Sequence, residues 1–418
     1  MKKIIKKKAV NKFSIFLISI VLIFTLSNLV VAQEKHETLK VGFAFDITSM
    51  GAEWFLPELK AMNMEFERIN ENGGVKIGDT IYDLQLIEET TDFTAEGARA
   101  AGEKLIYKDE VDVIWGPGIM HTSMALQDIS LPLKIINLSQ CFGRECLTNK
   151  LCDGDIICNP YKYTLMIIST SYETTPGMWS WIKENYPDYK RVAEVNINTT
   201  AAHWCTGEIA KRALPLFGLE MVTEEYYEVG VTDFYPILTK VLAKDPDVIH
   251  FPNVGVTEMA LIMKQARELG YGPEKLFMLE NPKSPGLVEL TGSKEAVEGL
   301  TMLDFPSTPE LIDFENRYIE KFGTFVPLTK IPILPLPALL EAMQIVGNID
   351  DTDKIIELLT SRSWETYGLE IQFGGDEYYE VPNMIAYPLD IVQMRNGVWE
   401  KVGVVSIEDQ IGFWKKHQ

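Results

Sequence analysis

Few residues of the types that usually carry catalysis stand in a catalytic pattern. The 418-residue chain has only five histidines: His36, His121, His203, His250 and His417. None lies in an H-E-x-x-H metal motif, and no G-x-S-x-G, P-loop or S-x-x-K motif is present. His121 could act as a base, but the spacing suggests no nucleophile or carboxylate partner for it. The sequence therefore predicts a protein that is not an enzyme and carries no cofactor or metal.

A glycine turn is the first candidate for binding. The apolar run 111–115 leads into Gly116-Pro117-Gly118, and a helix is then expected to open with Met120, His121, Thr122 and Ser123. Free N–H groups and hydroxyls at a helix N-terminus suit a carboxylate. The alternative is that Thr122 and Ser123 merely cap the helix. A dinucleotide fingerprint is not indicated, because His121 stands where its third glycine would be.

Two further strand ends carry polar or aromatic side chains. The run 134–138 ends in Ser139, Gln140 and Cys141, and the first strand is followed closely by Trp54. In open α/β sheets, ligands bind beyond the carboxyl ends of the strands. These residues therefore join 120–123 in one predicted site, although Trp54 could equally be part of the core.

Alternation of apolar strands with amphipathic helices organises the chain. Expected strands cover 39–47, 82–90, 111–116, 134–139, 191–197, 219–229, 247–254 and 276–280. Expected helices cover 55–71, 94–108 and 256–269. In 55–71 and 256–269, apolar residues recur three or four positions apart. This βαβ order predicts mostly parallel sheets flanked by helices.

The pattern starts again near 191, which predicts two lobes. Breaks near 169–176 and 304–308 are the expected crossings between them. The first lobe is then 39–168 plus 305–375, and the second is 169–304 plus 376–418.

The N-terminus is typical of an export signal. Six lysines precede an apolar run, and Val30-Val31-Ala32 provides small residues for cleavage. Residues 1–32 are therefore predicted to be a signal peptide, and the mature protein to be periplasmic or otherwise extracytoplasmic. A retained membrane anchor is the alternative.

Net charge and cysteine content exclude some classes of partner and indicate how the cysteines are used. The net charge of −21 disfavours binding to nucleic acid or anionic lipid. Cys141, Cys146, Cys152 and Cys158 cluster, with Cys205 apart, and an exported chain favours disulfides over a metal site here. Their pairing stays open, and the odd number leaves one thiol over.

Several of these segments occur together in a known family. Ile69-Asn70, the segment Asn72-Gly73-Gly74-Val75, Asp92, and the strand ending in Gly116-Pro117 resemble the leucine/isoleucine/valine-binding family of type I periplasmic binding proteins. The resemblance spans about 39–400. It implies a two-lobed fold with a hinge, which closes on a small solute and delivers it to the membrane permease of an ABC importer. A monomer without nucleic-acid partners is expected.

The resemblance also assigns roles to positions of this chain. Trp54 matches the family's aromatic residue, 120–123 its carboxylate-binding turn, and Ser139, Gln140 and Cys141 its second carboxylate turn. In the second lobe, Trp204 or Cys205 falls near the lid tyrosine, and Glu280 or Asn281 near the acid that holds the amino group.

Departures from the family's pattern leave the ligand open. Met120 and Cys141 replace hydroxyl residues, and Gly255 stands where an aromatic residue is common. The ligand is thus a branched-chain or other amino acid, or an aromatic or aliphatic acid without the amino group. An exported α/β enzyme and a ligand-sensing receptor domain are the alternatives from other classes.

Overall fold

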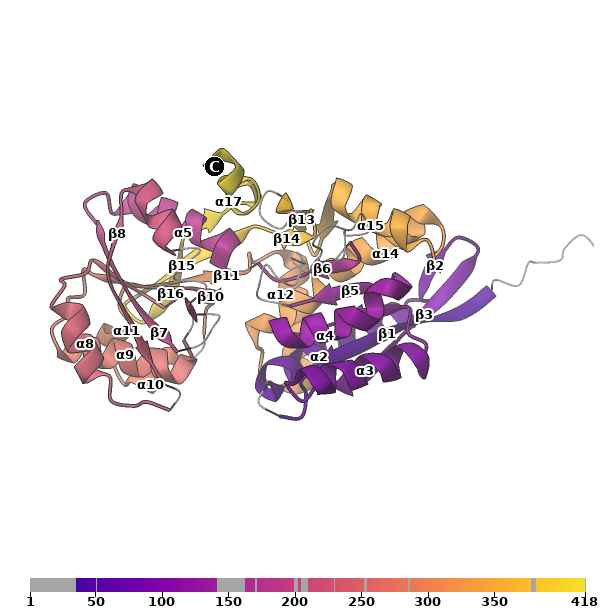
Figure 1. Ribbon diagram of the computed structural model, residues 1–418, viewed down its shortest axis with the longest axis horizontal. Helices are drawn as coiled ribbons and strands as arrows, with labels where there is room; N and C mark the ends of the chain where they lie inside the picture. The colour runs from indigo at the N-terminus through magenta and orange to yellow at the C-terminus, as the bar shows by residue number, and fades with distance from the viewer. Residues whose placement is uncertain are drawn as a thin grey trace, which may run out of the picture.

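The computed structural model describes residues 35–49, 51–140, 162–169, 171–198, 202–203, 210–228, 230–251, 254–284, 286–376 and 381–417. It shows two α/β lobes side by side, each built on one sheet (Figure 1). The predicted signal peptide and all five cysteines lie outside the described residues.

The first lobe holds a nine-stranded sheet, counted over the described residues, in the order β12-β13-β14-β6-β5-β4-β1-β3-β2. Its strands are β1 (Lys35–Phe45), β2 (Val75–Ile77), β3 (Thr80–Thr90), β4 (Val113–Trp115), β5 (Ile136–Ser139), β6 (Thr164–Met166), β12 (Ser363–Thr366), β13 (Leu369–Gly374) and β14 (Met384–Ala386). From β3 to β14 neighbouring strands run parallel, while β2 at one edge and β13 and β12 at the other are antiparallel.

Helices cover both faces of this sheet because its strands are apolar on both sides. Its helical segments are α2 (Ala52–Glu71), α3 (Ala95–Tyr107), α4 (Met120–Ser130), η1 (Leu131–Leu133), α12 (Pro309–Phe322), η5 (Pro327–Thr329), α13 (Lys330–Ile333), α14 (Pro335–Val346) and α15 (Thr352–Ser361). Along β1, Phe43 and Phe45 belong to the large core with α2, α12 and α14, whereas Ala44 packs in a smaller cluster with α3 and α4. This alternation is the period of a strand buried on both faces.

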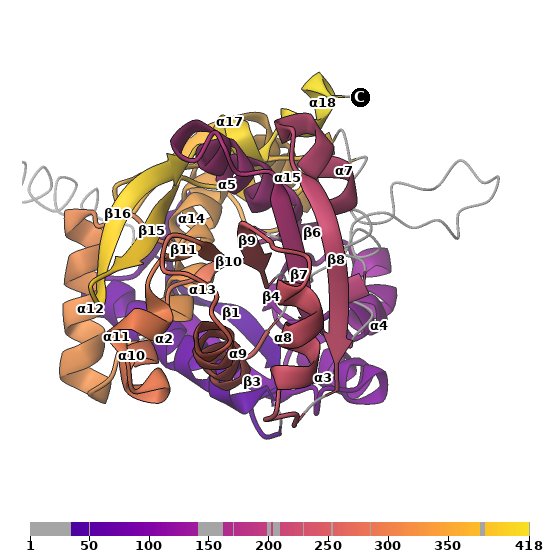
Figure 2. The ribbon, with the colours of Figure 1, turned by 90° about the vertical axis from the view of Figure 1, so that its left-hand side faces the viewer.

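The second lobe has a seven-stranded sheet, again over the described residues, in the order β16-β15-β11-β10-β9-β7-β8. Its elements are α5 (Ser171–Asn185), β7 (Arg191–Ile197), α7 (Lys211–Ala213), η4 (Leu214–Phe217), β8 (Glu220–Tyr227), α8 (Tyr235–Leu242), β9 (Val248–His250), α9 (Val256–Glu268), β10 (Leu276–Pro282), α10 (Leu287–Thr291), α11 (Lys294–Val297), β11 (Leu300–Asp304), β15 (Leu389–Arg395), β16 (Val398–Val405), α17 (Ile407–Gln410) and α18 (Phe413–Lys416). Figure 2 views this lobe end on, with β8 at one edge of the sheet and β16 at the other. The predicted parallel sheets flanked by helices are confirmed.

Three connections between the sheets fall in the described part of the chain or border it. The first joins β6 to α5, the second joins β11 to α12, and the third joins β14 to β15. Phe305 in the second connection stacks on Tyr387 in the third, with ring centroids 5.7 Å apart. Gln410 ties the first to the third, because its Oε1 accepts from Ser169 Oγ (3.0 Å) and its Nε2 donates to the Tyr387 carbonyl (2.6 Å).

One predicted break and one predicted lobe boundary need correction. Residues 171–176 are not a break but the start of α5, and the polar Glu173, Thr174 and Thr175 are buried. Their polarity indicated a loop, whereas they lie inside the lobe. The first lobe also extends beyond 375, because β14 pairs with β13 and β6 in the nine-stranded sheet.

One described segment has the length and mean hydropathy of a membrane span. It is Pro327–Val346, with a mean hydropathy of 1.2. In the structure 72% of its apolar window is buried, chiefly as α13 and α14 in the core of the first lobe. Burial of this kind is typical of a core helix in a large domain.

Candidate functional site

The carboxyl ends of the parallel strands in the two lobes point toward each other (Figure 1). The chain leaves the first sheet at the carboxyl end of β6 and the second sheet at the carboxyl end of β11. Since β1, β3, β4 and β5 run parallel to β6, their ends share its edge, and β7, β9 and β10 likewise share the edge of β11. Ligands of open α/β sheets bind at such edges.

Asp46 shapes the end of β1. Its buried carboxylate accepts from Ser49 N (2.9 Å), Ser49 Oγ (2.6 Å) and Gly51 N (2.7 Å). Burial opposes ionisation, but these hydrogen bonds prevail and the pKa of Asp46 is lowered. The loop so held leads into the first turn of α2, where Trp54 is 43% exposed. Trp54 is therefore not a core residue, and its ring is open to a ligand.

Gly116 and Gly118 are required by close packing around the turn after β4. Gly116 has a φ of +118°, and a Cβ there would lie 2.4 Å from the Ala44 carbonyl oxygen. A Cβ on Gly118 would lie 2.1 Å from Cζ of Phe55. Between them, the Pro117 carbonyl accepts from the backbone N–H of Gln140 at 3.1 Å, which fastens the turn to the end of β5.

Gly118→Ala is expected to lower the free energy of unfolding by about 1–3 kcal/mol, because the buried Phe55 ring must move. Urea denaturation measures this effect. Gly102→Ala is the matched control, since its Cβ would meet the flexible side chain of Leu126 at 3.3 Å in the middle of α3. Helix propensity favours that alanine by about 1 kcal/mol. Equal destabilisation by both substitutions would contradict the role of Gly118.

The predicted hydroxyls around this turn bond within the protein. Thr122 Oγ1 donates to the Ile119 carbonyl (2.9 Å), and the Ser123 and Ser139 hydroxyls are 2.9 Å apart. Both serines also reach the Pro117 carbonyl, at 3.3 and 2.9 Å. Their oxygens therefore stabilise the turn. The N-cap residue of α4, Ile119, has no acceptor in its side chain, so the first turn of the helix presents N–H groups without a side-chain cap.

His121 lies at the surface beside this helix start. Its Nε2 is 3.0 Å from the Phe93 carbonyl oxygen, and the two rings meet edge to face with centroids 6.5 Å apart. A backbone carbonyl neither accepts a proton at neutral pH nor activates a nucleophile. The geometry of His121 thus gives no support to a role as a catalytic base.

Gln140 meets a buried acid that the sequence did not single out. Its Nε2 donates to Oε2 of Glu58, which lies one turn after Trp54 on α2. Burial raises the pKa of Glu58 well above its usual value, and the hydrogen bond from Gln140 only partly opposes this. The hydrogen bond to Glu58 therefore fixes the Gln140 side chain. The sequence signal that could have identified Glu58 is its position four residues after Trp54, which places the two residues on the same side of α2.

A row of buried polar side chains occupies the facing edge of the second lobe. His250 on β9 contacts Glu194 Oε1 through Nδ1 (2.9 Å) and Glu280 Oε1 through Nε2 (2.5 Å). Thr175 in α5 also donates to Glu280 Oε1 (2.7 Å), and the Trp179 ring lies edge-on to His250 at 5.2 Å. Sequence reasoning placed only Glu280 of these five residues in the predicted site.

The charges in this row follow from its geometry. Burial alone would lower the pKa of His250, but the two flanking carboxylates outweigh burial and raise it to about 10. Burial likewise disfavours the Glu280 carboxylate, yet the imidazolium and Thr175 lower its pKa. His250 is therefore protonated at neutral pH, and Glu280 is ionised.

The sequence profile of the periplasmic binding protein family matches residues 38–393. The chain belongs to the periplasmic binding protein family. It is a solute-binding protein and not an enzyme. No protein with a curated description matches the sequence.

Solved structures agree with this assignment at the level of the fold. A leucine-binding protein LivK from Thermotoga maritima is 20% identical with a TM-score of 0.67, covering 89% of this chain and 100% of that one. LivJ from Streptococcus pneumoniae, in complex with isoleucine, is 18% identical with a TM-score of 0.68, covering 88% and 99%. A solute-binding protein from Rhodopseudomonas palustris, in complex with 3,4-dihydroxybenzoic acid, is 18% identical with a TM-score of 0.67, covering 88% and 97%. The prediction that the chain is a periplasmic binding protein is confirmed.

The predicted site residues of this periplasmic binding protein fall into three groups. Those gathered at the edge of the first lobe are Trp54, Met120, His121, Thr122, Ser123, Ser139 and Gln140. Glu280 lies on the facing edge of the second lobe, and Asn281 follows it in β10. Cys141, Trp204 and Cys205 lie outside the described residues. Within the described residues, no group of His, Cys, Asp or Glu could hold a metal ion.

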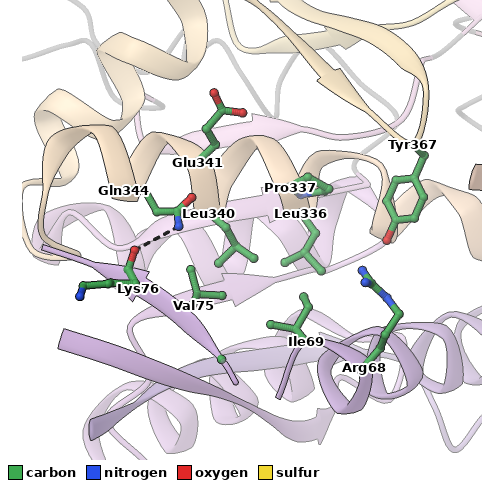
Figure 3. Close-up of a pocket in the computed structure, with 11 residues that line it drawn as sticks. Arg68, Ile69, Val75, Lys76, Leu336, Pro337, Leu340, Glu341, Gln344 and Tyr367 are labelled. Carbon is green, nitrogen blue, oxygen red and sulfur yellow. Dashed lines mark hydrogen bonds between the residues drawn. The ribbon is translucent and has the colours of Figure 1, made fainter. Parts of the chain in front are cut away.

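A separate cavity of about 450 Å³ lies on the first lobe between the end of α2, β2 and α14 (Figure 3). Ile69, Val75 and Leu340 form part of its apolar floor, and Gln344 Nε2 donates to the Lys76 carbonyl (3.0 Å) across one end. It adjoins the start of β3, at the opposite edge of the sheet from Ser139. This cavity is therefore distinct from the site at the lobe junction.

Proposed function

We propose that this periplasmic binding protein is the extracytoplasmic receptor of an ABC importer and captures an amino acid between its two lobes. Complementary charge carries the proposal. The first lobe offers uncapped N–H groups at the start of α4, which suit a carboxylate. The second lobe offers Glu280, whose buried Oε2 has no hydrogen-bond partner among the described residues, and it suits an ammonium group.

The ligand contacts are assigned to both lobes. Trp54, Met120, His121, Thr122, Ser123, Ser139 and Gln140 form the wall on the first lobe. Glu280 and Asn281 belong to the wall on the second lobe. The assignment of Cys141, Trp204 and Cys205 as ligand contacts rests on the sequence resemblance alone. We place the carboxylate on the His121 and Thr122 N–H groups, since the hydroxyls nearby are already used. A solute held by both walls favours the closed arrangement over the open one.

The proposed function also implies a cellular location and a protein partner. We place the protein in the periplasm or on the outer face of the membrane, exported through the signal peptide at 1–32. As a monomer, it delivers its solute to the membrane permease. The closed state must differ from the open state in the surface shown to that permease, because a solute that bound both equally would transmit nothing.

A second candidate ligand is an aromatic or aliphatic acid without an amino group. Met120 replaces a hydroxyl by a thioether in the carboxylate turn, which makes the pocket less polar. The relative from Rhodopseudomonas palustris was solved with 3,4-dihydroxybenzoic acid. This candidate leaves Glu280 Oε2 without a cationic partner, and we rank it second for that reason.

Matched pairs of solutes test the proposal. Calorimetry would compare leucine with 4-methylpentanoate and phenylalanine with 3-phenylpropionate, so that each pair differs in the amino group. The amine-bearing member is expected to bind at least tenfold more tightly. Preference for the deaminated member would establish the second candidate. Binding of no member of a broad panel of amino acids and organic acids would overturn solute capture at this site.

Trp54→Ala is expected to weaken solute binding by about tenfold, because the exposed indole is the largest apolar surface of the first-lobe wall. Calorimetry with the best solute measures the loss. Leu133→Ala is the control, since Leu133 is similarly exposed, at 47%, but lies at the far end of α4. Equal solute affinities of the two variants would show that Trp54 does not contact the solute.

A further inference from the structure

Three ionisable residues stand side by side on adjacent strands of the second lobe. Glu194 and His250 are register partners on β7 and β9, and Glu280 lies on the next strand, β10. One face of the row is covered by α5, whose Thr175 and Trp179 contact Glu280 and His250. Because α5 begins directly after the first connection, the Glu280 end of the row lies near the lobe junction.

Every polar atom but one in the Glu280–His250 contact is satisfied within the described residues. Both imidazole nitrogens meet carboxylate oxygens, and Glu280 Oε1 accepts from Thr175 as well as facing His250. Glu280 Oε2 is buried and has no partner among the described residues. An unpaired buried oxygen of an ionised carboxylate is unfavourable unless a cation reaches it.

The row has an uncompensated charge. One imidazolium between two carboxylates leaves a net charge of minus one. Among the other charged groups nearby, Lys211 on α7 pairs with Glu224 and acts on Glu194 only through space. Glu173, buried at the start of α5, acts on Tyr387 in the third connection. Neither residue contacts Glu280 Oε2.

We propose that His250, anchored by Glu194, is a positioning residue that keeps Glu280 ionised and directs its free Oε2 to the cationic nitrogen of the solute. The inference rests on the proposed function and narrows the solute class to molecules with a protonated amine. His250 itself touches no solute. Its charge replaces the hydration that the buried Glu280 carboxylate has lost.

The role of His250 predicts a distinctive pH dependence. In the wild type, His250 stays charged below its pKa of about 10, so amine binding is nearly constant from about pH 5.5 to about pH 8.5. In His250→Gln, the neutral amide can still donate to Glu280, but the stabilising charge is gone. The pKa of the buried Glu280 then rises, and its proton must leave before an ammonium can bind. Amine affinity therefore falls as the pH falls.

Calorimetry on the full-length protein across this pH range tests the inference, using the amine-bearing solute and its deaminated analogue. For His250→Gln, the affinity for the amine is expected to fall at least tenfold between about pH 8.5 and about pH 5.5, against less than threefold in the wild type. Affinity for the deaminated analogue should change little with pH in either protein. Glu225→Gln, on the neighbouring strand β8 and paired with Lys240, is the charge-matched control and should behave as wild type.

Glu194→Gln provides a second test that preserves shape. It removes one charge from the row while keeping an acceptor for His250, and it should weaken amine binding about fivefold at every pH. If both variants fail to fold, the ¹⁵N NMR chemical shifts of the His250 ring in the wild-type protein test whether the imidazole is protonated. An imidazolium that persists above about pH 8 supports the inference, and a neutral ring at about pH 7 overturns it.

The outcomes separate this inference from the proposed function. Wild-type protein that binds amine-bearing solutes, with His250→Gln showing the wild-type pH profile, overturns the positioning role and leaves solute capture intact. An equal loss for the amine and its analogue at all pH values gives His250 a structural role only and also overturns the inference. Failure of the wild type to bind any solute is failure of the proposed function itself.

Discussion

Glu65→Ala is expected to lower the free energy of unfolding by about 3–5 kcal/mol, the largest effect on stability among the changes considered. Glu65 on α2 is completely buried, and its carboxylate accepts three hydrogen bonds and makes one further ion-pair contact. Arg68 donates through Nε at 2.9 Å, and its terminal nitrogen forms an ion pair at 2.9 Å. Arg317 of α12 donates at 2.6 Å, and the Tyr367 hydroxyl donates at 2.8 Å. Removing the acid leaves these partly buried donors without an acceptor.

Glu67→Ala is the matched control for that experiment. Glu67 lies two residues along the same helix and pairs with Lys321, but its side chain is 59% exposed. Exposed ion pairs contribute less than about 1 kcal/mol. Guanidinium denaturation of the two variants measures the difference, and a loss of less than about 1 kcal/mol for Glu65→Ala would show that the cluster does not hold α2 to α12.

Glu280→Gln should produce the largest effect on binding. The substitution keeps the shape of the side chain and an oxygen for Thr175 and His250, but it removes the negative charge offered to the solute. Hydrogen bonds to charged groups contribute about 1.5–3 kcal/mol, which corresponds to about a tenfold to hundredfold loss of affinity for an amine-bearing solute. Calorimetry on the preferred solute gives this value directly.

The deaminated analogue is the internal control for Glu280→Gln. It offers no cation, so its affinity should stay the same or rise once the charge is removed. A loss that is equal for both solutes would mean that Glu280 acts only by holding the second lobe together. Thermal unfolding of the variant without solute distinguishes that case, because a structural role would lower its midpoint.

Elements with a clear period could be predicted from the sequence, and very short strands could not. The helix at 55–71 and the strands at 39–47 and 191–197 bury regular sets of side chains, and the structure places helices and strands there. The short strands β6 and β14 have only three residues each, too few to show a period. Their place in the sheet depends on partners more than two hundred residues apart in sequence.

Strand ends and turns in the sequence pointed to the candidate site on the first lobe, whereas Glu280 and Asn281 on the second lobe were named only through the family resemblance. Strand ends after glycine turns pointed to the wall of the first lobe, including Ser139 and Gln140. In the second lobe, Glu194 and His250 lie within apolar strands, where an isolated polar residue gives no indication of its partners. Only the lateral order of β7, β9 and β10 brings them next to Glu280. The sequence could not show that Ser123 and Ser139 bond to each other, because that contact depends on the turn at Pro117.

The side chain of Gln410 has a consequence for the motion between the lobes. Ser169 and Tyr387 lie in two different connections, and both bond to this one amide. Rotation about the junction must either carry Gln410 along with both strands or break one of these bonds. Gln410, 241 residues away from Ser169, thus links the two connections, and the strength of its hydrogen bonds affects how readily the lobes rotate relative to each other. Mutations in α17, which lies away from the candidate site, would then change the equilibrium between the open and closed arrangements of the lobes, and with it the rate of transport.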